Sequence, residues 1–282
     1  MSSNKLKWMA LIFMLLDHVA EFISGFSIWF HWIGRLSAPI FLFCCVWSFD
    51  YTRNKKMYLM RLYIASVIMS VIQSIYDIPN NFFRTLFSLC LVLYLFEIYK
   101  NKKEWIRYFI IYISWQFIST ILTVFLINIS SNLTESIFIY VFPTLCGNIF
   151  NLEGGFIFVV LGIIFYLFKN NTVKLAISFT VFDLFYFFVS TTSIIGVVLG
   201  KMGQVFGFNI SDLIDYIMQN IVGLGQMDLG GSPIFENYQW MMIFSLFFIL
   251  IYNGKEGKKH KWVFYIFYPA HILILCLMFG VN

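Results

Sequence analysis

Long apolar stretches recur along nearly the whole chain, and they constrain its fold more than any other feature of the sequence. Most are about 15 to 25 residues long, and a helix needs about 20 apolar residues to cross the hydrocarbon core of a bilayer. Only 12% of the 282 residues are charged, whereas soluble domains average about 25%. A soluble enzyme, a disulfide-rich scaffold and a disordered chain are therefore excluded. Because a backbone in lipid must satisfy its own hydrogen bonds, the sequence predicts an all-α, polytopic transmembrane helix bundle.

Breaker residues and charge clusters divide the chain into nine predicted spans. They cover residues 7–22, 33–49, 57–76, 82–99, 105–127, 156–168, 175–199, 238–252 and 262–279. The stretch 137–150 is short and contains Pro143 and Gly147, so we expect a re-entrant or interfacial segment there. A ten-span alternative, in which 137–150 crosses and 175–199 divides near Ser190, stays open. We expect a single integral membrane domain over residues 1–282.

The distribution of basic residues predicts the orientation of these spans. With nine spans, one side receives 16 of the 19 Lys and Arg residues, and with ten spans the division is 14 to 5. The positive-inside rule then predicts a multi-pass cell-membrane protein with a cytoplasmic N-terminus and an external C-terminus. The acidic, glycine-rich segment 201–236 is predicted to be an external loop. Within it, 210–221 has helical spacing and is expected to lie on the membrane surface or to act as a connector.

Four ionisable residues stand out inside the predicted spans, namely Asp17, His18, Asp183 and His271. Charged groups at bilayer depth cost at least about 2.5 to 3.5 kcal/mol each, so each needs a partner or a purpose. A rise of about 1.5 Å per residue places His18, Asp183 and His271 about 14 to 16 Å from the lysine that marks the cytoplasmic end of each span. This depth is near the middle of the membrane, and it predicts a buried site formed by facing helices.

The motif LLDHVAEF in the first span is the strongest single candidate. Glu21 follows His18 by three residues on the same helix face, whereas Asp17 points about 100° away. For His271 or Asp183 alone, a structural hydrogen-bonding role is an equally good interpretation. The five cysteines form no CxxC or Cys/His cluster, and no metal site is predicted.

Basic residues also form clusters outside the apolar stretches. Arg35 lies at the outer entrance of the second span and precedes Pro39, a pattern that also suits a kinked helix with a snorkelling arginine. Two basic turns on the cytoplasmic side are predicted to bind either lipid headgroups or the phosphates of a nucleotide-bearing cofactor. Their residues are Arg53, Lys55 and Lys56 in the first turn and Lys255, Lys258 and Lys259 in the second.

Four sequence blocks resemble the TraX family of membrane proteins, best known for N-terminal acetylation of conjugative pilin. They read LKWMALIFMLLDHVAEF, IGRLSAPIFLF, YTRNKKMYLMRL and ILIYNGKEGKKHKWVFYIFYPAHILIL, in family order from Leu6 to Leu275, and NLEGGF adds a weaker match. The spacing of Lys7 and His18 also resembles transmembrane acyltransferases of the acyltransferase family 3 kind. In that group the histidine is regarded as catalytic, and acyl-CoA approaches from the cytoplasm. Ser48 and Phe49 replace an acidic-Gly pair common in that group, with Asp50 as a possible substitute.

The resemblance implies a transmembrane acetyltransferase that moves an acetyl group from cytoplasmic acetyl-CoA to an acceptor. The acceptor would be an amine, such as the N-terminus of a pilin or secreted peptide, or a hydroxyl of a cell-surface glycan. His18 would act as general base or acyl carrier, with Asp17 or Glu21 fixing its tautomer and Arg35 or His271 holding the acceptor or the oxyanion. Contacts to CoA are expected from Lys7, Arg53, Lys55, Lys56, Arg61, Tyr252, Asn253, Lys255, Lys258 and Lys259.

Two other functions are consistent with the same residues. A proton-coupled transporter or flippase would use Asp17, His18, Asp183 and His271 as a proton relay. A scaffold of a secretion or pilus system would tolerate the loss of all four groups. Membrane lipids are expected partners in every case, and nucleic acid is not.

Overall fold

The computed structural model describes residues 1–23, 25–99, 104–224, 230–258 and 260–280, and these residues form helices without any strand. The prediction of an all-α helix bundle is confirmed. Most long helices coincide closely with predicted spans, because charged or helix-breaking residues on either side of an uninterrupted apolar stretch determine where the helix begins and ends. The long helices are α1 (Ser3–Phe22), α3 (Ser37–Tyr51), α4 (Lys55–Tyr76), α5 (Phe82–Tyr99), α6 (Trp105–Ile129), α9 (Gly155–Phe168), α10 (Thr172–Thr191) and α14 (Lys261–Phe279), of which α10 differs most from its predicted span.

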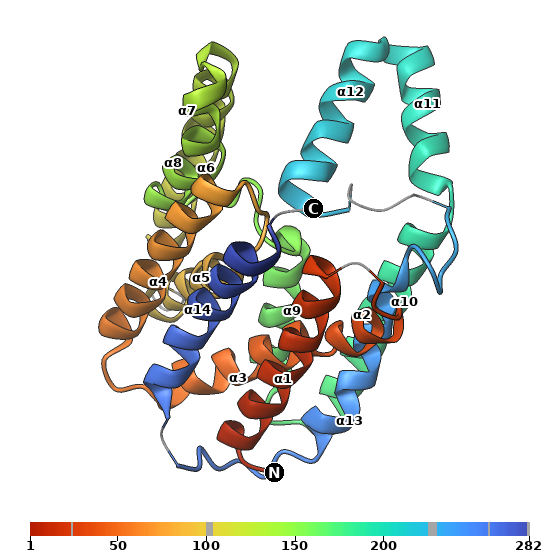
Figure 1. Ribbon diagram of the computed structural model, residues 1–282. Coiled ribbons are helices and arrows are strands. Elements are labelled where there is room, and N and C mark those ends of the chain that lie inside the picture. Colours follow the sequence, from red (N-terminus) through yellow and green to blue (C-terminus); the bar gives the residue numbers. More distant parts are fainter. Residues whose placement is uncertain (24, 100–103, 225–229, 259, 281–282) are drawn as a thin grey trace.

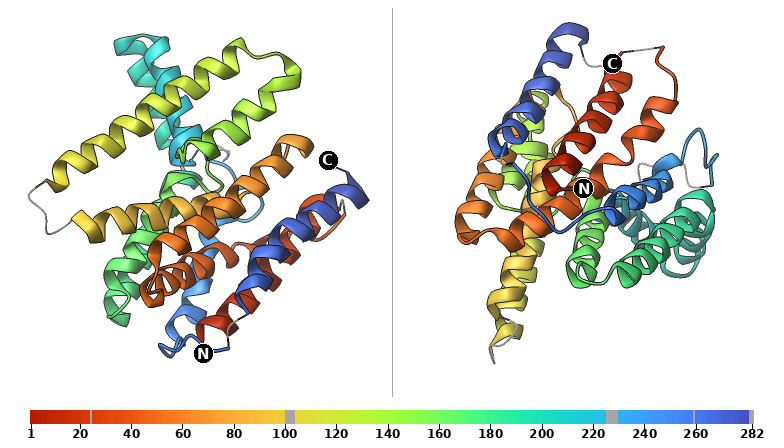
Figure 2. Two further views of the ribbon diagram at one scale, coloured as in Figure 1. Left: turned by 90° about the vertical axis from the view of Figure 1, so that its left-hand side faces the viewer. Right: turned by 90° about the horizontal axis from the view of Figure 1, so that it is seen from below.

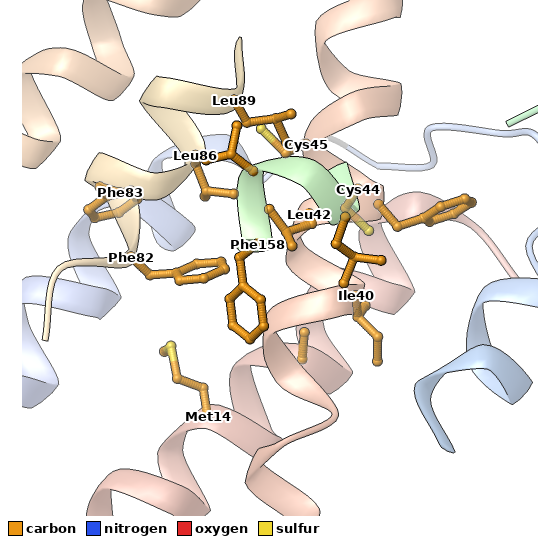
Figure 3. Packing of buried hydrophobic residues seen from close by; sticks show 14 of the residues in the cluster. Met14, Ile40, Leu42, Cys44, Cys45, Phe82, Phe83, Leu86, Leu89 and Phe158 are labelled. Atoms are coloured by element: carbon orange, nitrogen blue, oxygen red, sulfur yellow. The ribbon is translucent and has the colours of Figure 1, made fainter. Parts of the chain in front are cut away.

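The centre of the bundle is formed around α1. This helix packs against α3 and α14, α3 packs in turn against α5 and α9, and α4 lies against both α5 and α14. Figures 1 and 2 show the first and last long helices side by side. The buried side chains between α1, α3, α5 and α9 are aliphatic, aromatic and thiol groups, part of which is shown in Figure 3.

Backbone hydrogen bonds close one end of the bundle, which we call the basic end. It consists of the start of α1, the turn 52–54 and the segment 252–258. The amide of Ser3 donates to the carbonyl of Lys255 at 2.9 Å, and the amide of Asn4 donates to that of Glu256 at 3.0 Å. The amide of Asn253 donates to the carbonyl of Met1 at 2.9 Å. The segment before α14 is therefore fixed against the beginning of α1.

The second predicted span is divided into a short helix α2 (Trp29–Gly34) and α3. Together they form a continuous apolar segment from Trp29 to Tyr51. Gly34 lies directly against α1, since a Cβ atom at this position would be only 2.4 Å from the side chain of Asp17. The glycine thus lets the two helices approach closely at the level of the ionisable residues.

The stretch 137–150 is helical only in its first part. A short helix α7 (Asn132–Ser136), a π-helical turn η1 (Ile137–Val141) and α8 (Phe142–Leu145) are contiguous and pack against α4 and α6. This helical stretch is shorter than the usual minimum of about 17 residues for a crossing. The chain then turns, and the side chain of Asn148 donates to the hydroxyl of Thr120 on α6 at 3.0 Å.

The prediction of one span over 175–199 is wrong. Helix α10 ends at Thr191, and a separate helix α11 (Ile194–Phe206) follows. The hydroxyl of Thr191 bonds back to the carbonyl of Phe187 at 2.7 Å, and the carbonyl of Ser190 accepts from the amide of Gly230 at 3.3 Å. Consecutive Ser and Thr side chains compete with helical hydrogen bonds, which explains the interruption.

The predicted loop 201–236 begins inside α11 and is helical over much of its length. Helix α12 (Phe208–Ile217) and the π-helical turn η2 (Met218–Val222) follow α11, so the helical spacing predicted for 210–221 is confirmed. Figure 1 shows α11 and α12 as a hairpin that projects away from the basic end. The chain then returns along α10 as a 3-10 helix η3 (Tyr238–Phe244) and α13 (Ser245–Leu250).

The described helices identify the chain as a membrane protein. Five helical segments are long and apolar enough to cross a bilayer, whereas others, such as α9 with 14 residues, are shorter than a typical crossing. The five segments are Trp29–Tyr51, Lys55–Tyr76, Trp105–Ile129, Thr172–Thr191 and Trp262–Phe279.

Candidate functional site

One face of α1 lines two cavities in succession. The residues on this face recur at intervals of three and four, which places them in one stripe along a helix. Asn4, Lys7, Leu11 and Met14 line a cavity near the basic end. Met14, His18 and Glu21 line a second cavity farther along the helix.

The apolar cavity, near the basic end, has a volume of about 230 Å³. Its walls are mostly aromatic and aliphatic side chains from α1, α3, α4, α5 and α14, including Phe83, Leu86 and Tyr265. Three cations and one carboxylate also line it, namely Lys7, Arg61, Lys258 and Glu256. The ammonium of Lys7 donates to the hydroxyl of Ser48 at 2.8 Å. An apolar chamber in which these cations outnumber the carboxylate suits a ligand with an apolar tail and anionic groups.

The polar cavity has a volume of about 370 Å³ and lies between α1, α2, the beginning of α5 and the segments 151–154 and 236–239. Four carboxylates line it, against the single guanidinium of Arg35; they belong to Asp17, Glu21, Glu153 and Glu236. The two cavities therefore differ in charge as well as in polarity.

His18 and His271 form a buried pair beside the polar cavity. Nδ1 of His18 lies 2.7 Å from Nε2 of His271, and the rings stack with centroids 5.0 Å apart. The side chains are 4% and 6% exposed, respectively. Helix α1 supplies the first and α14 the second, so the contact that brings α1 and α14 together also joins the two rings.

The hydrogen bonds of His271 determine the tautomer of both rings. Its Nδ1 lies 2.8 Å from the carbonyl oxygen of Phe267, and because a carbonyl only accepts, Nδ1 carries the proton. In the neutral ring Nε2 is then an acceptor, so Nδ1 of His18 donates to it. The unprotonated nitrogen of a neutral His18 is consequently Nε2, which is the form required of a general base.

Two side chains from the α2 segment donate hydrogen bonds to the carboxylate of Asp17. Its Oδ1 lies 2.8 Å from Nδ1 of His31, and its Oδ2 forms an ion pair with the guanidinium of Arg35. Arg35 also donates to Oε1 of Gln239 at 3.0 Å and lies over the ring of Tyr238. The sequence singled out Arg35 but not His31, which belongs to the motif HWIGR two residues from a predicted span boundary.

The hydrogen bond to His18 expected from Asp17 or Glu21 is made by His271 instead. Asp17 bonds to His31 and Arg35, and Oε2 of Glu21 accepts a hydrogen bond from the side-chain amide of Asn80 at 3.3 Å. Nδ1 of His18 donates to a ring on the distant helix α14. A residue 253 positions away in the chain cannot be identified as the partner from helical spacing within α1.

A third polar group, missed by sequence reasoning, approaches the histidine pair. The hydroxyl of Tyr268 donates to Oε2 of Glu153 at 2.8 Å and accepts from the amide of Phe82 at 3.1 Å. The Tyr268 ring lies 6.1 Å from that of His18. Burial raises the pKa of Glu153, in the loop before α9, to about 7. The signal in the sequence was the motif NLEGGF, where an acidic residue precedes an apolar helix.

The two glycines of NLEGGF place Glu153 in the cavity wall. Gly154 and Gly155 have φ angles of +75° and +69°, which side chains with a Cβ rarely adopt. A Cβ atom on Gly155 would lie 2.3 Å from the Cα atom of Gly223, at the end of η2. The backbone at Gly223 thus packs directly on this turn, and both segments line the polar cavity.

Six of the ten residues predicted to bind CoA fall into three groups. Lys7, Arg61 and Lys258 line the apolar cavity. Arg53 and Lys56 are exposed in the turn between α3 and α4 and do not line it. Lys55 forms an ion pair with Glu97 of α5, so its charge is already neutralised.

The remaining predicted CoA contacts shape the basic end. The hydroxyl of Tyr252 lies 3.1 Å from that of Tyr51, and Oδ1 of Asn253 accepts from the amide of Lys255 at 3.2 Å. The backbone of Lys255 in turn accepts from Ser3. Lys259 lies outside the described residues.

Asp183 does not join the other ionisable groups. It is buried on α10, which packs against α9, η3 and α13, and it does not line the polar cavity. Its Oδ1 is one of the buried oxygens for which the described residues provide no hydrogen-bond donor. Depth in the membrane was therefore insufficient to predict convergence, because depth does not specify which helices are neighbours.

The family model described as TraX protein matches residues 2–279. No curated protein and no solved structure matches the chain.

Proposed function

The chain belongs to the TraX family, and from this premise we propose that it is a membrane acetyltransferase using acetyl-CoA as donor and an amine as acceptor. The observation that carries the proposal is the buried histidine pair, whose hydrogen bonds leave Nε2 of His18 unprotonated beside the polar cavity. The acetyl donor enters the apolar cavity, and the acceptor enters the polar cavity.

The apolar cavity fits the donor by its chemistry. Lys7, Arg61 and Lys258 line it and would bind the CoA phosphates through charge-assisted hydrogen bonds. The aromatic and aliphatic walls would hold the pantetheine arm and direct the thioester along α1 toward His18. With the basic end facing the cytoplasm, as the positive-inside rule predicts, the donor comes from the compartment that contains acetyl-CoA.

The polar cavity fits an amine acceptor better than a hydroxyl. Its four carboxylates outnumber the one guanidinium, so the field in the cavity attracts a cation such as the ammonium group of a peptide N-terminus. The cavity lies on the far side of the histidine pair from the basic end. An acceptor at the external face would therefore reach His18 without crossing the bundle.

The transfer step uses the lone pair on Nε2 of His18. The bound ammonium group first gives one proton to a carboxylate that lines the polar cavity. The resulting neutral amine attacks the thioester carbonyl carbon, so a C–N bond forms while the C–S bond breaks. Nε2 of His18 takes the proton from the attacking nitrogen and returns it to the sulfur of CoA, which leaves as the thiol. His271 accepts the hydrogen bond from Nδ1 of His18 throughout and so stabilises the transient imidazolium.

The test is acetyl transfer by the His18→Ala variant, purified in lipid nanodiscs, from labelled acetyl-CoA to a panel of peptides with free N-termini. We expect the rate to fall by about 10² to 10⁴, the usual contribution of a general base. Acetyl-CoA should still raise the melting temperature of the variant, because His18 does not line the apolar cavity. Transfer at the wild-type rate would contradict the proposal.

The rival transporter hypothesis needs a relay of four ionisable groups. The separation of Asp183 from the polar cavity argues against that relay. Acetyl-CoA discriminates the two functions, since it should stabilise the enzyme against heat and leave a proton-coupled transporter unaffected.

A further inference from the structure

Three side chains line both cavities, and each comes from a different helix. They are Met14 of α1, Phe41 of α3 and Phe82 of α5, and we call them the partition. Every other lining residue belongs to one cavity only. The partition is thus where the donor side and the acceptor side of the molecule meet.

The partition is built from apolar groups held in place by their neighbours. The rings of Phe41 and Phe82 are 6.5 Å apart, and Phe82 also packs against Phe158 at 6.4 Å. The backbone amide of Phe82 is fixed by the hydroxyl of Tyr268. Figure 3 shows the side chain of Met14 pointing toward the rings of Phe82 and Phe158.

The position of Met14 relates the partition to the histidine pair. Met14 precedes His18 by four residues, so it occupies the same face of α1 one turn closer to the basic end. A group moving from the apolar cavity along this face passes Met14 before it reaches His18. Since the partition offers only hydrocarbon and thioether atoms, that group must be small and uncharged.

We propose that the partition selects the donor by the length of its acyl chain, admitting acetyl and excluding longer acyl groups. The inference rests on the proposed acetyltransferase function and extends it to donor specificity. The acetyl end of the thioester passes between Met14 and the two rings. Each further methylene must displace a packed aromatic ring, which is rigid, unlike the flexible side chain of methionine.

The experiment compares acetyl-, propionyl- and butyryl-CoA as donors for wild type, Phe41→Ala, Phe41→Leu and Met14→Ala. We expect the ratio of kcat/KM for butyryl-CoA to that for acetyl-CoA to rise about 10- to 100-fold in Phe41→Ala, since a methylene in a tight apolar site is worth about 10- to 200-fold in specificity. Met14→Ala should give a smaller rise in this ratio. Phe41→Leu keeps the core filled, so its rise should lie between those of Met14→Ala and Phe41→Ala.

The matched control is Phe43→Ala, on the same helix but away from both cavities. Phe43 is 3% exposed and packs against Phe165 and Tyr252, so its loss creates a similar void without opening the partition. We expect its donor ratio to equal that of wild type. A thermal shift with CoA alone should be the same in all variants, which reports an intact donor cavity independently of turnover.

The outcomes separate this inference from the function on which it rests. Acetyl transfer with an unchanged donor ratio in Phe41→Ala and Met14→Ala would overturn the length filter and leave the acetyltransferase intact. An equal change in Phe43→Ala would also overturn it, because loss of packing would then explain the effect. If wild type transfers no acyl group while CoA gives no thermal shift, the acetyltransferase proposal itself fails.

Discussion

The apolar and polar cavities share α1 as a wall, yet they differ in almost every other property. The apolar cavity is lined by aromatic rings and by Lys7, Arg61 and Lys258, whereas the polar cavity is lined by four carboxylates and Arg35. Along the shared face of α1, Lys7, Leu11 and Met14 line the apolar cavity, and His18 and Glu21 follow in the polar cavity. Two chemically opposite ligands can thus approach one histidine from two ends of the same helix.

The strongest test of this contrast removes the charge balance of the polar cavity. Asp17→Asn should lower the free energy of unfolding by about 3 kcal/mol, the low end of the range for a buried pair, because it leaves the half-buried guanidinium of Arg35 without its counter-ion. Thermal denaturation in nanodiscs measures the effect. The double variant Asp17→Asn, Arg35→Gln should recover part of it, and full stability of the single variant would show that the pair does not organise the cavity.

The histidine pair gives the next largest effect. His271→Ala should lower kcat by about 100-fold, since Nδ1 of His18 loses the acceptor that fixes its tautomer. His271→Gln keeps an acceptor oxygen and should retain more activity. A purely structural role for His271 would lower the melting temperature of both variants equally and leave kcat per folded molecule unchanged.

One wall of the polar cavity depends on Gly155, because the backbone of Gly223 leaves no room for a side chain there. Gly155→Ala should cost about 1 to 3 kcal/mol, because it combines a strained φ with a Cβ placed on the backbone of Gly223. Gly196→Ala on α11 is the matched control, since a Cβ there has no neighbour within 4 Å. Equal melting temperatures for the two variants would contradict the close approach.

Substitutions of the lysines in the apolar cavity should give the smallest effect, and this effect should be confined to the KM for the donor. Lys7→Gln or Lys258→Gln should raise KM for acetyl-CoA about tenfold with kcat little changed, since a hydrogen bond to a charged group contributes about 1.5 to 3 kcal/mol at most. Lys56→Gln, exposed outside the cavity, is the control. A change in the KM for the acceptor instead would reverse the assignment of the two cavities.

The sequence was sufficient to predict the helices and their most unusual residues. Apolar length and bounding charges located α5 without error, and the rarity of ionisable groups in lipid singled out His18, Asp17 and His271. Contacts between distant helices could not be predicted from the sequence. His18 pairs with His271, and Tyr268 with Glu153, because particular helices and loops pack together. The order of the spans and the depth of a residue do not determine which helices are neighbours.

The separation of the histidine pair along the chain has a consequence for biogenesis. His18 lies on α1, and its partner on α14 follows 253 residues later in the chain. The ring that fixes its tautomer is therefore absent until α14 has entered the membrane beside α1. While the intervening residues are synthesised, the imidazole of His18 lacks this partner, so the histidine pair forms only when the two helices meet.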